Sequence, residues 1–310
     1  MLAVWLEWVW EWIKALAEST FALSAIGSLA GAWGGAYAIQ RIAEKAKKRD
    51  GLLQELRTCC HAIEMAHNVG NTYIELKRQH VKALKELYDT QRAEVHALHA
   101  ANAAGALPPG LQVHIAFESD LMNPVRTRAA YLESLVLEKM SAPVRPRSIS
   151  VMLTRATEQL NETIELRNQV LSRLSQMSHQ ERFARMFGLP VPAGVDNLYR
   201  DYVDGIHQYT DDSIHFARMV GEDLYEYGKR VRKEYQDALP RRQRRDVMMV
   251  PVVYWTDEEN AHLLPSKEKY TSWYTGFVYR IPRTKGRRFA KAWLWLRKAA
   301  RKVLGQRKRP

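Results

Sequence analysis

Cysteine is nearly absent from this chain, and the sequence signatures of the common enzyme classes are missing. The two cysteines, Cys59 and Cys60, are adjacent, and neighbouring cysteines rarely bond to each other. We expect both to be small core residues of a protein in a reducing compartment. The sequence contains no Gly-rich phosphate loop ending in Lys-Ser/Thr, no Gly-x-Ser-x-Gly motif and no Cys-x-x-Cys pair. It therefore indicates no cofactor and favours a non-enzymatic protein.

Charge is absent from residues 19–40, and a dense positive run follows at once. A helix of this length rises about 33 Å, which is the thickness of the hydrocarbon core of a bilayer. We predict a transmembrane helix over residues 19–40. Lys14 is the only cation before it, whereas five cations follow closely: Arg41, Lys45, Lys47, Lys48 and Arg49. The positive-inside rule then predicts a single-pass protein of the inner (plasma) membrane, with the N-terminus outside and the bulk cytoplasmic.

The composition of this stretch leaves an alternative open. Ala, Gly and Ser make up much of it, and these residues lie near neutral on membrane-insertion scales. A buried helix in a soluble bundle is therefore the alternative to a membrane span. Residues 1–18 hold four tryptophans, Trp5, Trp8, Trp10 and Trp12, together with a narrow stripe of charged residues. We expect an amphipathic, Trp-rich helix that lies in the outer interface or extends the spanning helix.

Small residues in the same stretch recur at the spacing of a helix–helix contact. The motifs are Gly27-x-x-x-Gly31 and Gly31-x-x-x-Gly35, with Ala30-x-x-x-Gly34 beside them. Missing side chains let two helix backbones approach closely, which is the basis of helix pairing in lipid. We predict a homo-oligomer assembled through Gly27, Gly31, Gly34 and Gly35. The alternative is that an Ala/Gly-rich composition produces this spacing without any pairing.

Apolar residues recur at helical spacings from the positive run to about residue 100. The polar faces of this helix are expected to carry Glu55, Lys77, Lys82, Lys85, Glu86 and Arg92. Further helices are predicted over residues 125–140, 148–187 and 196–238. The expected signals at their ends are Gly188 with Pro190 as a stop, Asp196 as an N-cap and Pro240 beyond the last helix. Residues 41–240 are therefore predicted to form a cytoplasmic, elongated antiparallel helical bundle or coiled-coil stalk.

The pattern changes to that of a small β element over residues 241–282. Residues 247–255 and 272–281 are rich in Val, Tyr, Trp and Phe, which predicts two strands of a C-terminal β-hairpin. Pro251 lacks a backbone donor, so it places the first strand at an edge or a bulge. Because two strands alone are only marginally stable, we expect them to dock on the bundle. The predicted fold class is thus mainly α, with this hairpin as its β part.

The positive charge of the chain is concentrated in a basic tail over residues 283–310. Thirteen Lys and Arg lie in residues 280–310, which contain no Asp or Glu, so the remaining 34 cations balance the 34 acidic residues. Residues 287–304 predict a basic amphipathic helix on the anionic inner leaflet. The residues expected at the membrane surface are Arg287, Arg288, Phe289, Lys291, Trp293, Leu296, Arg297, Lys298, Arg301 and Lys302. Nucleic acid and the groove of a partner protein are the alternative targets.

Three carboxylate–histidine pairs have the spacing of helical metal ligands. They are Asp204 with His207, Asp212 with His215, and Glu64 with His67. Di-iron bundles use Glu-x-x-His because both side chains then point into the core. Two of these pairs use the shorter Asp, and no partner carboxylates stand out. We therefore predict no metal site.

These features together predict a non-enzymatic, membrane-anchored oligomeric scaffold, sensor or membrane-perturbing effector. Its partners would be the lipid bilayer, further copies of the chain, and a protein bound to the helical stalk. A bacterial toxin-like or antiviral setting is an analogy of architecture only. The alternatives from other classes are a membrane-tethered nucleic-acid-binding protein and a metal-dependent helical-bundle enzyme.

Overall fold

A computed structural model describes residues 5, 8–11, 20–107, 120–192, 194–253 and 258–276. The chain divides into two units, residues 1–265 and residues 266–310. The first contains α2 (Thr20–Leu76), η1 (Lys77–Val81), α3 (Lys82–Ala103), α4 (Ala129–Glu138), α5 (Val144–Ser175), α6 (His179–Phe187), β1 (Pro190–Val191), β2 (Gly194–Val195), α7 (Leu198–Ala238), η2 (Arg241–Gln243) and η3 (Glu258–Leu263). The second contains η4 (Lys267–Tyr270) and α8 (Thr271–Thr275). The prediction of a mainly helical protein with bundle-like packing is confirmed.

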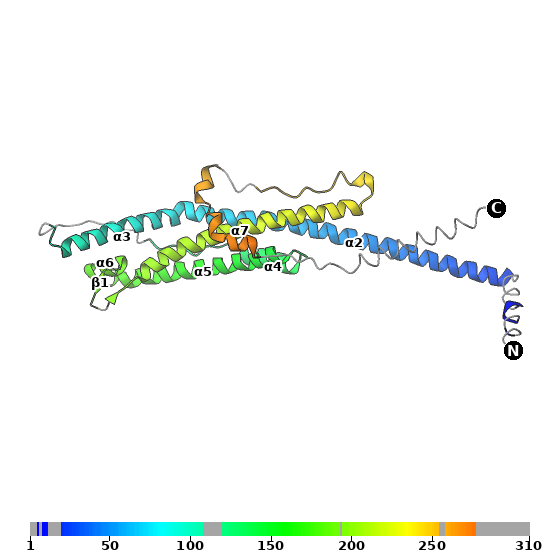
Figure 1. Cartoon of the computed structure of the whole chain (residues 1–310), viewed down its shortest axis with the longest axis horizontal. Helices are drawn as coiled ribbons and strands as arrows, with labels where there is room; N and C mark the ends of the chain where they lie inside the picture. Colours follow the sequence, from blue (N-terminus) through cyan, green and yellow to red (C-terminus); the bar gives the residue numbers. More distant parts are fainter. Residues whose placement is uncertain are drawn as a thin grey trace. The chain divides into compact units, whose positions relative to one another are not determined.

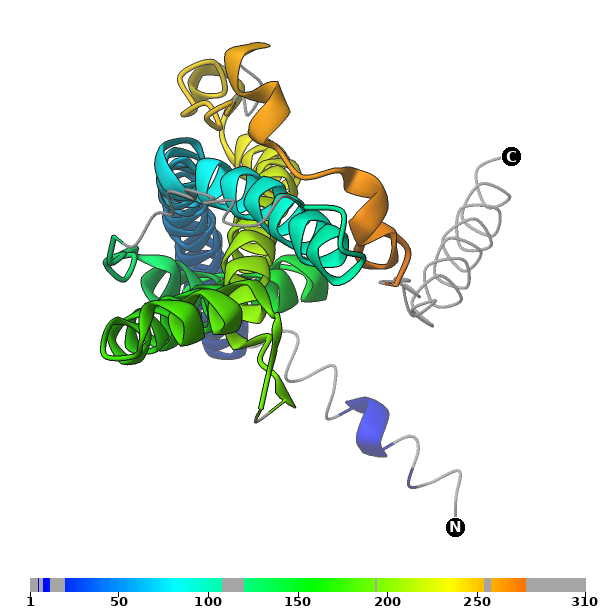
Figure 2. The ribbon, with the colours of Figure 1, turned by 90° about the vertical axis from the view of Figure 1, so that its left-hand side faces the viewer.

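The long helix α7 packs against both α2 and α5 (Figures 1 and 2). It runs antiparallel to α2, because the Cys59 thiol donates to the carbonyl of Leu224 whereas Lys77 bonds to Asp211. It is also antiparallel to α5, since Arg145 pairs with Asp223 near one end. At the other end of α5, Arg167 meets Tyr199. The helices α2 and α5 therefore run in the same direction, and the long helix α7 opposes both.

An extended segment, residues 120–128, carries the chain back and makes this parallel arrangement possible. Side chains of α5 hold it: Asn168 bonds both the N–H and the C=O of Met122, and Asn161 does the same for Val125. The seven residues from Asn161 to Asn168 rise about 10.5 Å along α5, and the three residues from Met122 to Val125 span about 10 Å of extended chain. The spacing of the two asparagines therefore equals the spacing of the two backbone positions that they bond. The sequence predicted an antiparallel arrangement of the long helices. This arrangement holds for α7 against α2 and for α7 against α5, but not for α2 against α5, which are parallel.

One cluster of core residues lies where α3, α5, α6 and α7 meet. Tyr88 of α3 stacks on Phe187 of α6, with 5.9 Å between ring centroids, and meets the edge of Tyr199 of α7 at 5.4 Å. The Tyr88 hydroxyl donates to the carbonyl of Met186 at 3.0 Å. Leu171 and Leu174 of α5 close the cluster from the other side. Packed aromatic rings, together with the hydrogen-bonded hydroxyl of Tyr88, thus hold α3, α6 and α7 together at this end of the bundle.

The predicted helix over residues 148–187 begins earlier and is interrupted. α5 starts at Val144, and Pro146 lies in its first turn, where the missing N–H has no intrahelical partner to lose. The break is at residues 176–178, where the Ser178 hydroxyl accepts from the backbone N–H of Glu181 and caps α6. Gly188 ends α6 in the left-handed region, with φ of 68°, so the predicted stop at Gly188 is confirmed. Asp196 accepts from the N–H of Leu198, the first residue of α7.

The predicted strands at residues 247–255 and 272–281 are wrong in the part of those ranges that the structure describes. Residues 247–253 form no regular element, and residues 271–275 form the short helix α8. The β-hairpin lies elsewhere, at β1 and β2, which pair antiparallel with Pro190 opposite Val195 and Val191 opposite Gly194. Pro251 and a run of arginines favour an irregular chain over a strand here, and α7 ends before it at Ala238. The predicted tail helix, residues 287–304, lies outside the described residues.

Residues 19–40 fall almost entirely within α2, which begins at Thr20 and continues without interruption into the bundle. In the parts of the chain that the structure describes, no helix has a stretch long and apolar enough to cross a membrane.

Candidate functional site

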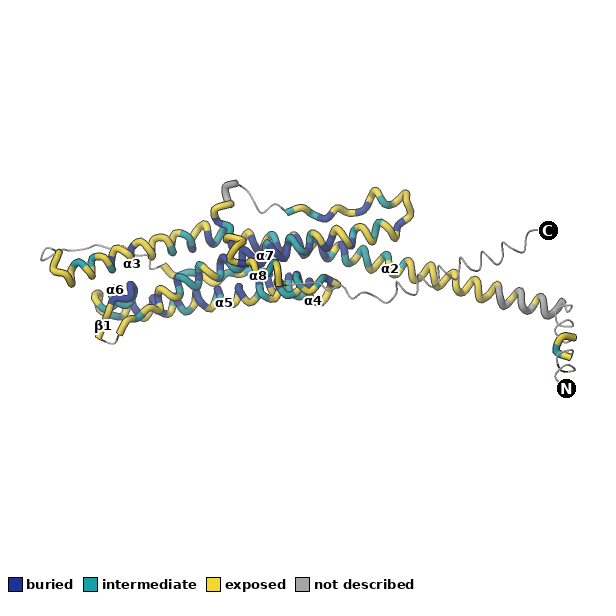
Figure 3. Tube along the Cα trace, viewed as in Figure 1, coloured by how far each residue is buried: buried dark blue, intermediate teal, exposed yellow. Residues whose placement is uncertain are grey.

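The N-terminal part of α2 extends away from the bundle as a single helix, which we call the arm (residues 31–45) (Figure 3). Every residue of the arm is exposed, and along α2 beyond the arm the first buried residue is Leu56. The arm holds three of the four glycines predicted to assemble subunits: Gly31, Gly34 and Gly35. A Cβ atom added to any of them would meet nothing within 4 Å. Gly27 lies in α2 as well, but its surroundings are not among the described ones.

Several large apolar side chains of the arm are exposed to solvent. Trp33 is 80% exposed, Ile39 70% and Ile42 68%. Gly31, Gly35, Ile39 and Ile42 recur at intervals of four, four and three residues, which places them on one helix face. Trp33 lies on the opposite face. A helix that is apolar around most of its circumference is normally covered by protein or by lipid, and within the described residues the chain supplies no such cover.

A positive collar, defined as Arg41, Lys45, Lys47, Lys48 and Arg49, follows the apolar part of the arm. The Arg41 guanidinium lies over the ring of Tyr37, with 5.4 Å from Cζ to the ring centroid. In the described parts of the chain, no carboxylate lies within 4.0 Å of any cation in the collar. Two carboxylates neighbour the collar in the sequence, those of Glu44 and Asp50, and that of Glu44 accepts from the Gln40 amide at 3.0 Å. The collar therefore presents unneutralised positive charge.

A second polar site lies inside the bundle, at the π-helical turn η1 that joins α2 to α3. Lys77, which opens this turn, bonds through Nζ to Oδ1 of Asp211 in α7 at 2.5 Å. It also donates to the carbonyl of Leu263 in η3 at 2.9 Å. Both ion-pair partners are buried. The sequence placed Lys77 on a polar face, and this prediction is wrong because η1 turns its side chain toward α7.

One turn before η1, the hydroxyl of Tyr73 joins α2 to α5 and to the extended segment. It bonds to the Thr157 hydroxyl at 2.5 Å and lies 3.3 Å from that of Thr127. Burial raises the pKa of the Tyr73 phenol, although the hydrogen bonds to these threonines act in the opposite direction. The phenol therefore stays neutral at physiological pH, and the cluster serves as a hydrogen-bonded tie rather than as an acid–base centre.

The cysteines are free and buried, as predicted for small core residues. The Cys59 thiol donates to the carbonyl of Leu224 at 3.2 Å. Burial, followed by the neighbouring Cys60 and Glu55, raises the pKa of Cys59 to about 12. A thiol that stays protonated is a poor nucleophile, so Cys59 is suited to packing rather than to catalysis.

In each of the three carboxylate–histidine pairs, one member makes another contact. Asp204 pairs with Lys85 and Arg200, and the Nε2 atom of His67 lies 3.0 Å from the Asn71 amide. His215 is buried and meets the ring of Phe216 edge to face. Among the residues that the structure describes, no group of three or more His, Cys, Asp or Glu is arranged to hold a metal ion.

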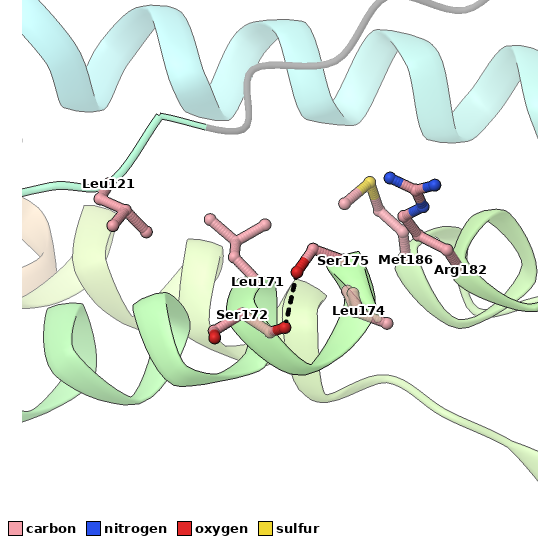
Figure 4. A pocket seen from close by; sticks show the side chains of 7 residues that line it. All are labelled: Leu121, Leu171, Ser172, Leu174, Ser175, Arg182 and Met186. Atoms are coloured by element: carbon pink, nitrogen blue, oxygen red, sulfur yellow. Dashed lines mark hydrogen bonds between the residues drawn. The ribbon is translucent and has the colours of Figure 1, made fainter. Parts of the chain in front are cut away.

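Two cavities flank the chain where the extended segment begins. One, of about 380 Å³, lies between Leu121, the end of α5 and α6, with Arg182 and Met186 at its rim (Figure 4). The other, of about 330 Å³, lies beside Arg167 of α5. Arg167 is buried and was not singled out from the sequence, whereas Lys77 was assigned to a polar face. The sequence nevertheless contains a signal for the burial of both residues. Arg167 follows Leu160 and Ile164 on the apolar face of α5, and Lys77 follows Tyr73 at a spacing of four.

Comparisons of the chain with protein-family models, with curated proteins and with solved structures give no match. Function is therefore inferred from the arm and from the interior of the bundle.

Proposed function

We propose that this protein is a non-enzymatic, membrane-anchored oligomeric scaffold or effector, in which the N-terminal part of α2 enters the bilayer and carries a helical bundle on the cytoplasmic side. The observation that supports this proposal is the exposure of the arm. Trp33, Ile39 and Ile42 would each lose a favourable burial of about 1.5–3 kcal/mol if they stayed in water. A bilayer provides that burial without any further part of this chain.

The charge pattern favours lipid over a soluble partner as the cover. The collar follows the apolar residues directly, and its cations are free of carboxylate partners within the described parts of the chain. Anionic headgroups attract such cations by about 1 kcal/mol each near the surface. The exposed tryptophans Trp5, Trp8 and Trp10 precede the apolar residues, where an aromatic belt at the other interface is expected. Apolar helix, aromatic belt and collar thus follow one another in the order of a single-pass anchor.

The oligomeric part of the proposal concerns the face formed by Gly31, Gly35, Ile39 and Ile42. Its two glycines leave a groove in which a second helix can approach closely, and open space surrounds both of them. The isoleucines extend the same face toward the bundle. Two copies of the arm that pair through this face would bring their bundles side by side, where a partner protein can bind to both.

Cell fractionation with a carbonate wash tests the anchor. Full-length protein with a tag at each terminus should stay in the membrane pellet, with its C-terminal tag protected from external protease and its N-terminal tag cleaved. Replacement of Ile39 and Ile42 by Glu should release it to the supernatant. If the wild-type protein is washed off by carbonate, α2 does not enter the bilayer and the anchor is refuted.

Chemical crosslinking in membranes tests the assembly. Gly31→Ile should abolish crosslinked oligomers, because its branched side chain separates the two backbones. Gly51→Ile is the matched control: Gly51 is another exposed glycine of α2 with nothing within 4 Å, but it lies outside the arm. Oligomers that survive Gly31→Ile, or that disappear equally in the control, would refute assembly through this face.

The basic tail is the second membrane contact in this proposal. Deletion of residues 287–310 should weaken binding to vesicles that contain anionic lipid and leave binding to neutral vesicles unchanged. A loss of RNA or DNA binding in place of vesicle binding would favour the membrane-tethered nucleic-acid-binding alternative.

A further inference from the structure

The cavity beside Arg167 has one charged wall and one apolar wall. It lies between the end of α2, η1, α3, the start of the extended segment and α5, and its volume is about 330 Å³. Its apolar lining consists of Leu76, Leu84, Leu121 and Met122. Arg167 supplies a full positive charge from α5. The cavity therefore offers a place both for a hydrocarbon group and for a negative charge.

Arg167 is only 1% exposed, yet its charge has no counter-ion among the residues that the structure describes. Its Nη1 donates to the backbone carbonyl of Asp120 at 3.0 Å, and its Nη2 donates to the Tyr199 hydroxyl at 3.3 Å. The guanidinium also lies 5.7 Å from the centroid of the Tyr199 ring. No described carboxylate approaches it within 4.0 Å, and its buried Nε has no hydrogen-bond partner there.

This arrangement is unfavourable as it stands. An arginine remains charged at every accessible pH, and burial of an unpaired charge is strongly opposed by lost hydration. The guanidinium has five N–H groups, of which two are used in the bonds to Asp120 and Tyr199. A buried, partly unsatisfied guanidinium at the wall of a cavity favours an anion inside that cavity, because carboxylate and phosphate oxygens match its geometry.

We propose that this cavity binds a small molecule through an oxyanion group, a carboxylate or a phosphate, with Arg167 as its counter-ion. The side chains of His80 and Asn123 line the same cavity and can donate further hydrogen bonds. Leu76 and Leu84 take up the apolar part of the molecule. Asp120 also lines the cavity, and its negative charge opposes the binding of such a ligand. This site does not depend on the arm or on the proposed membrane anchor.

Calorimetric titration of the purified full-length chain with inorganic phosphate, and separately with acetate, tests the site, with sodium chloride at matched ionic strength as the blank. Saturable binding of either oxyanion is expected. The ligand that binds should also raise Tm by about 3 °C at ten times its Kd. Binding of phosphate but not acetate would identify a phosphate group as the ligand chemistry, and the reverse result a carboxylate.

Variants separate the site from general charge effects. Arg167→Gln should weaken binding at least tenfold, whereas Arg182→Gln, the same change at the rim of the other cavity, should leave it unchanged. Since Arg167→Gln can impair folding, Asp120→Asn gives an independent test: Asp120 is exposed, and removal of its negative charge should tighten binding several-fold. The proposal is overturned if neither oxyanion binds, or if Asp120→Asn leaves the affinity unchanged.

Discussion

Lys77 of the π-helical turn η1 and Asp211 of α7 form an ion pair in the interior of the bundle, and Lys77 also donates to the carbonyl of Leu263. Three separate parts of the chain therefore meet at one ammonium group. A π-helical turn adds a residue to a helix and rotates the turns beyond it, and such turns are frequent at functional positions. Here the turn directs a lysine toward Asp211 in the interior of the bundle.

The first prediction concerns this pair. Lys77→Met leaves Asp211 buried without a counter-ion and should lower the free energy of unfolding by about 3–5 kcal/mol. Asp211→Leu should lower the free energy of unfolding by a similar amount, because it leaves Lys77 buried without a counter-ion. The double variant should be much less destabilised than the sum of the two, because both charges are then gone. Urea unfolding of the four proteins gives the coupling energy, and additive losses would show that the pair is not a unit.

The second prediction is a pH dependence that originates at Cys59. Burial raises its pKa to about 12 in the folded chain, whereas the unfolded thiol ionises near 9.0. The unfolded state therefore loses its proton first, so the stabilisation is complete below about pH 9 and is lost as the pH rises toward 12. At pH 10.5 the ionisation of Cys59 in the unfolded state should lower the free energy of unfolding by about 2 kcal/mol.

The Cys59→Ser variant provides the comparison, because a hydroxyl keeps the donor toward the Leu224 carbonyl and does not titrate in this range. The difference in unfolding free energy between pH 8 and pH 10.5 should be about 2 kcal/mol smaller in this variant than in the wild type. Equal losses in both proteins would mean that other groups, such as the buried tyrosines, govern the alkaline transition.

The third prediction contrasts two glycines. Gly188 ends α6 at a φ of 68°, and a Cβ atom there would lie 2.7 Å from the Asn197 side-chain oxygen. Gly188→Ala should destabilise the bundle by about 1–2 kcal/mol, since both the backbone conformation and the contact are unfavourable. Gly51→Ala, at an exposed position in the interior of α2, should instead stabilise by about 0.5–1 kcal/mol. Thermal unfolding measures both, and changes of the same sign would contradict this explanation.

The sequence predicted the parts of the fold that depend on local signals. Gly188 and Pro190 mark a helix end whatever surrounds them, and the apolar periodicity identifies the long helices. The polar interior could not be predicted in the same way. Lys77 and Arg167 occupy positions where apolar residues are expected, and a charged residue is normally assigned to the surface. Their burial depends on distant partners, Asp211 and Tyr199, which only the packed bundle brings to them.

The strand prediction over residues 247–255 was wrong in its described part, residues 247–253, for a related reason. Val, Tyr and Trp favour a pleated surface only where a partner strand supplies hydrogen bonds. The extended segment at residues 120–128 shows the alternative, because its backbone groups at Met122 and Val125 are satisfied by two asparagine side chains of α5. No local pattern in residues 120–128 indicates that their backbone groups bond to two asparagines spaced two turns apart on α5.

The last prediction tests that register directly. In the folded chain the Met122 amide donates to Asn168 and the Val125 amide to Asn161, at 3.2 and 2.7 Å. Asn168→Leu should accelerate hydrogen exchange of the Met122 amide at least tenfold and leave the Val125 amide protected, because the second clamp lies two helical turns away. Asn161→Leu should do the reverse. If each asparagine protects only its own amide, the two variants will show opposite patterns of exchange. Faster exchange of both amides in both variants would mean that the whole segment detaches from α5, and would contradict the proposed register.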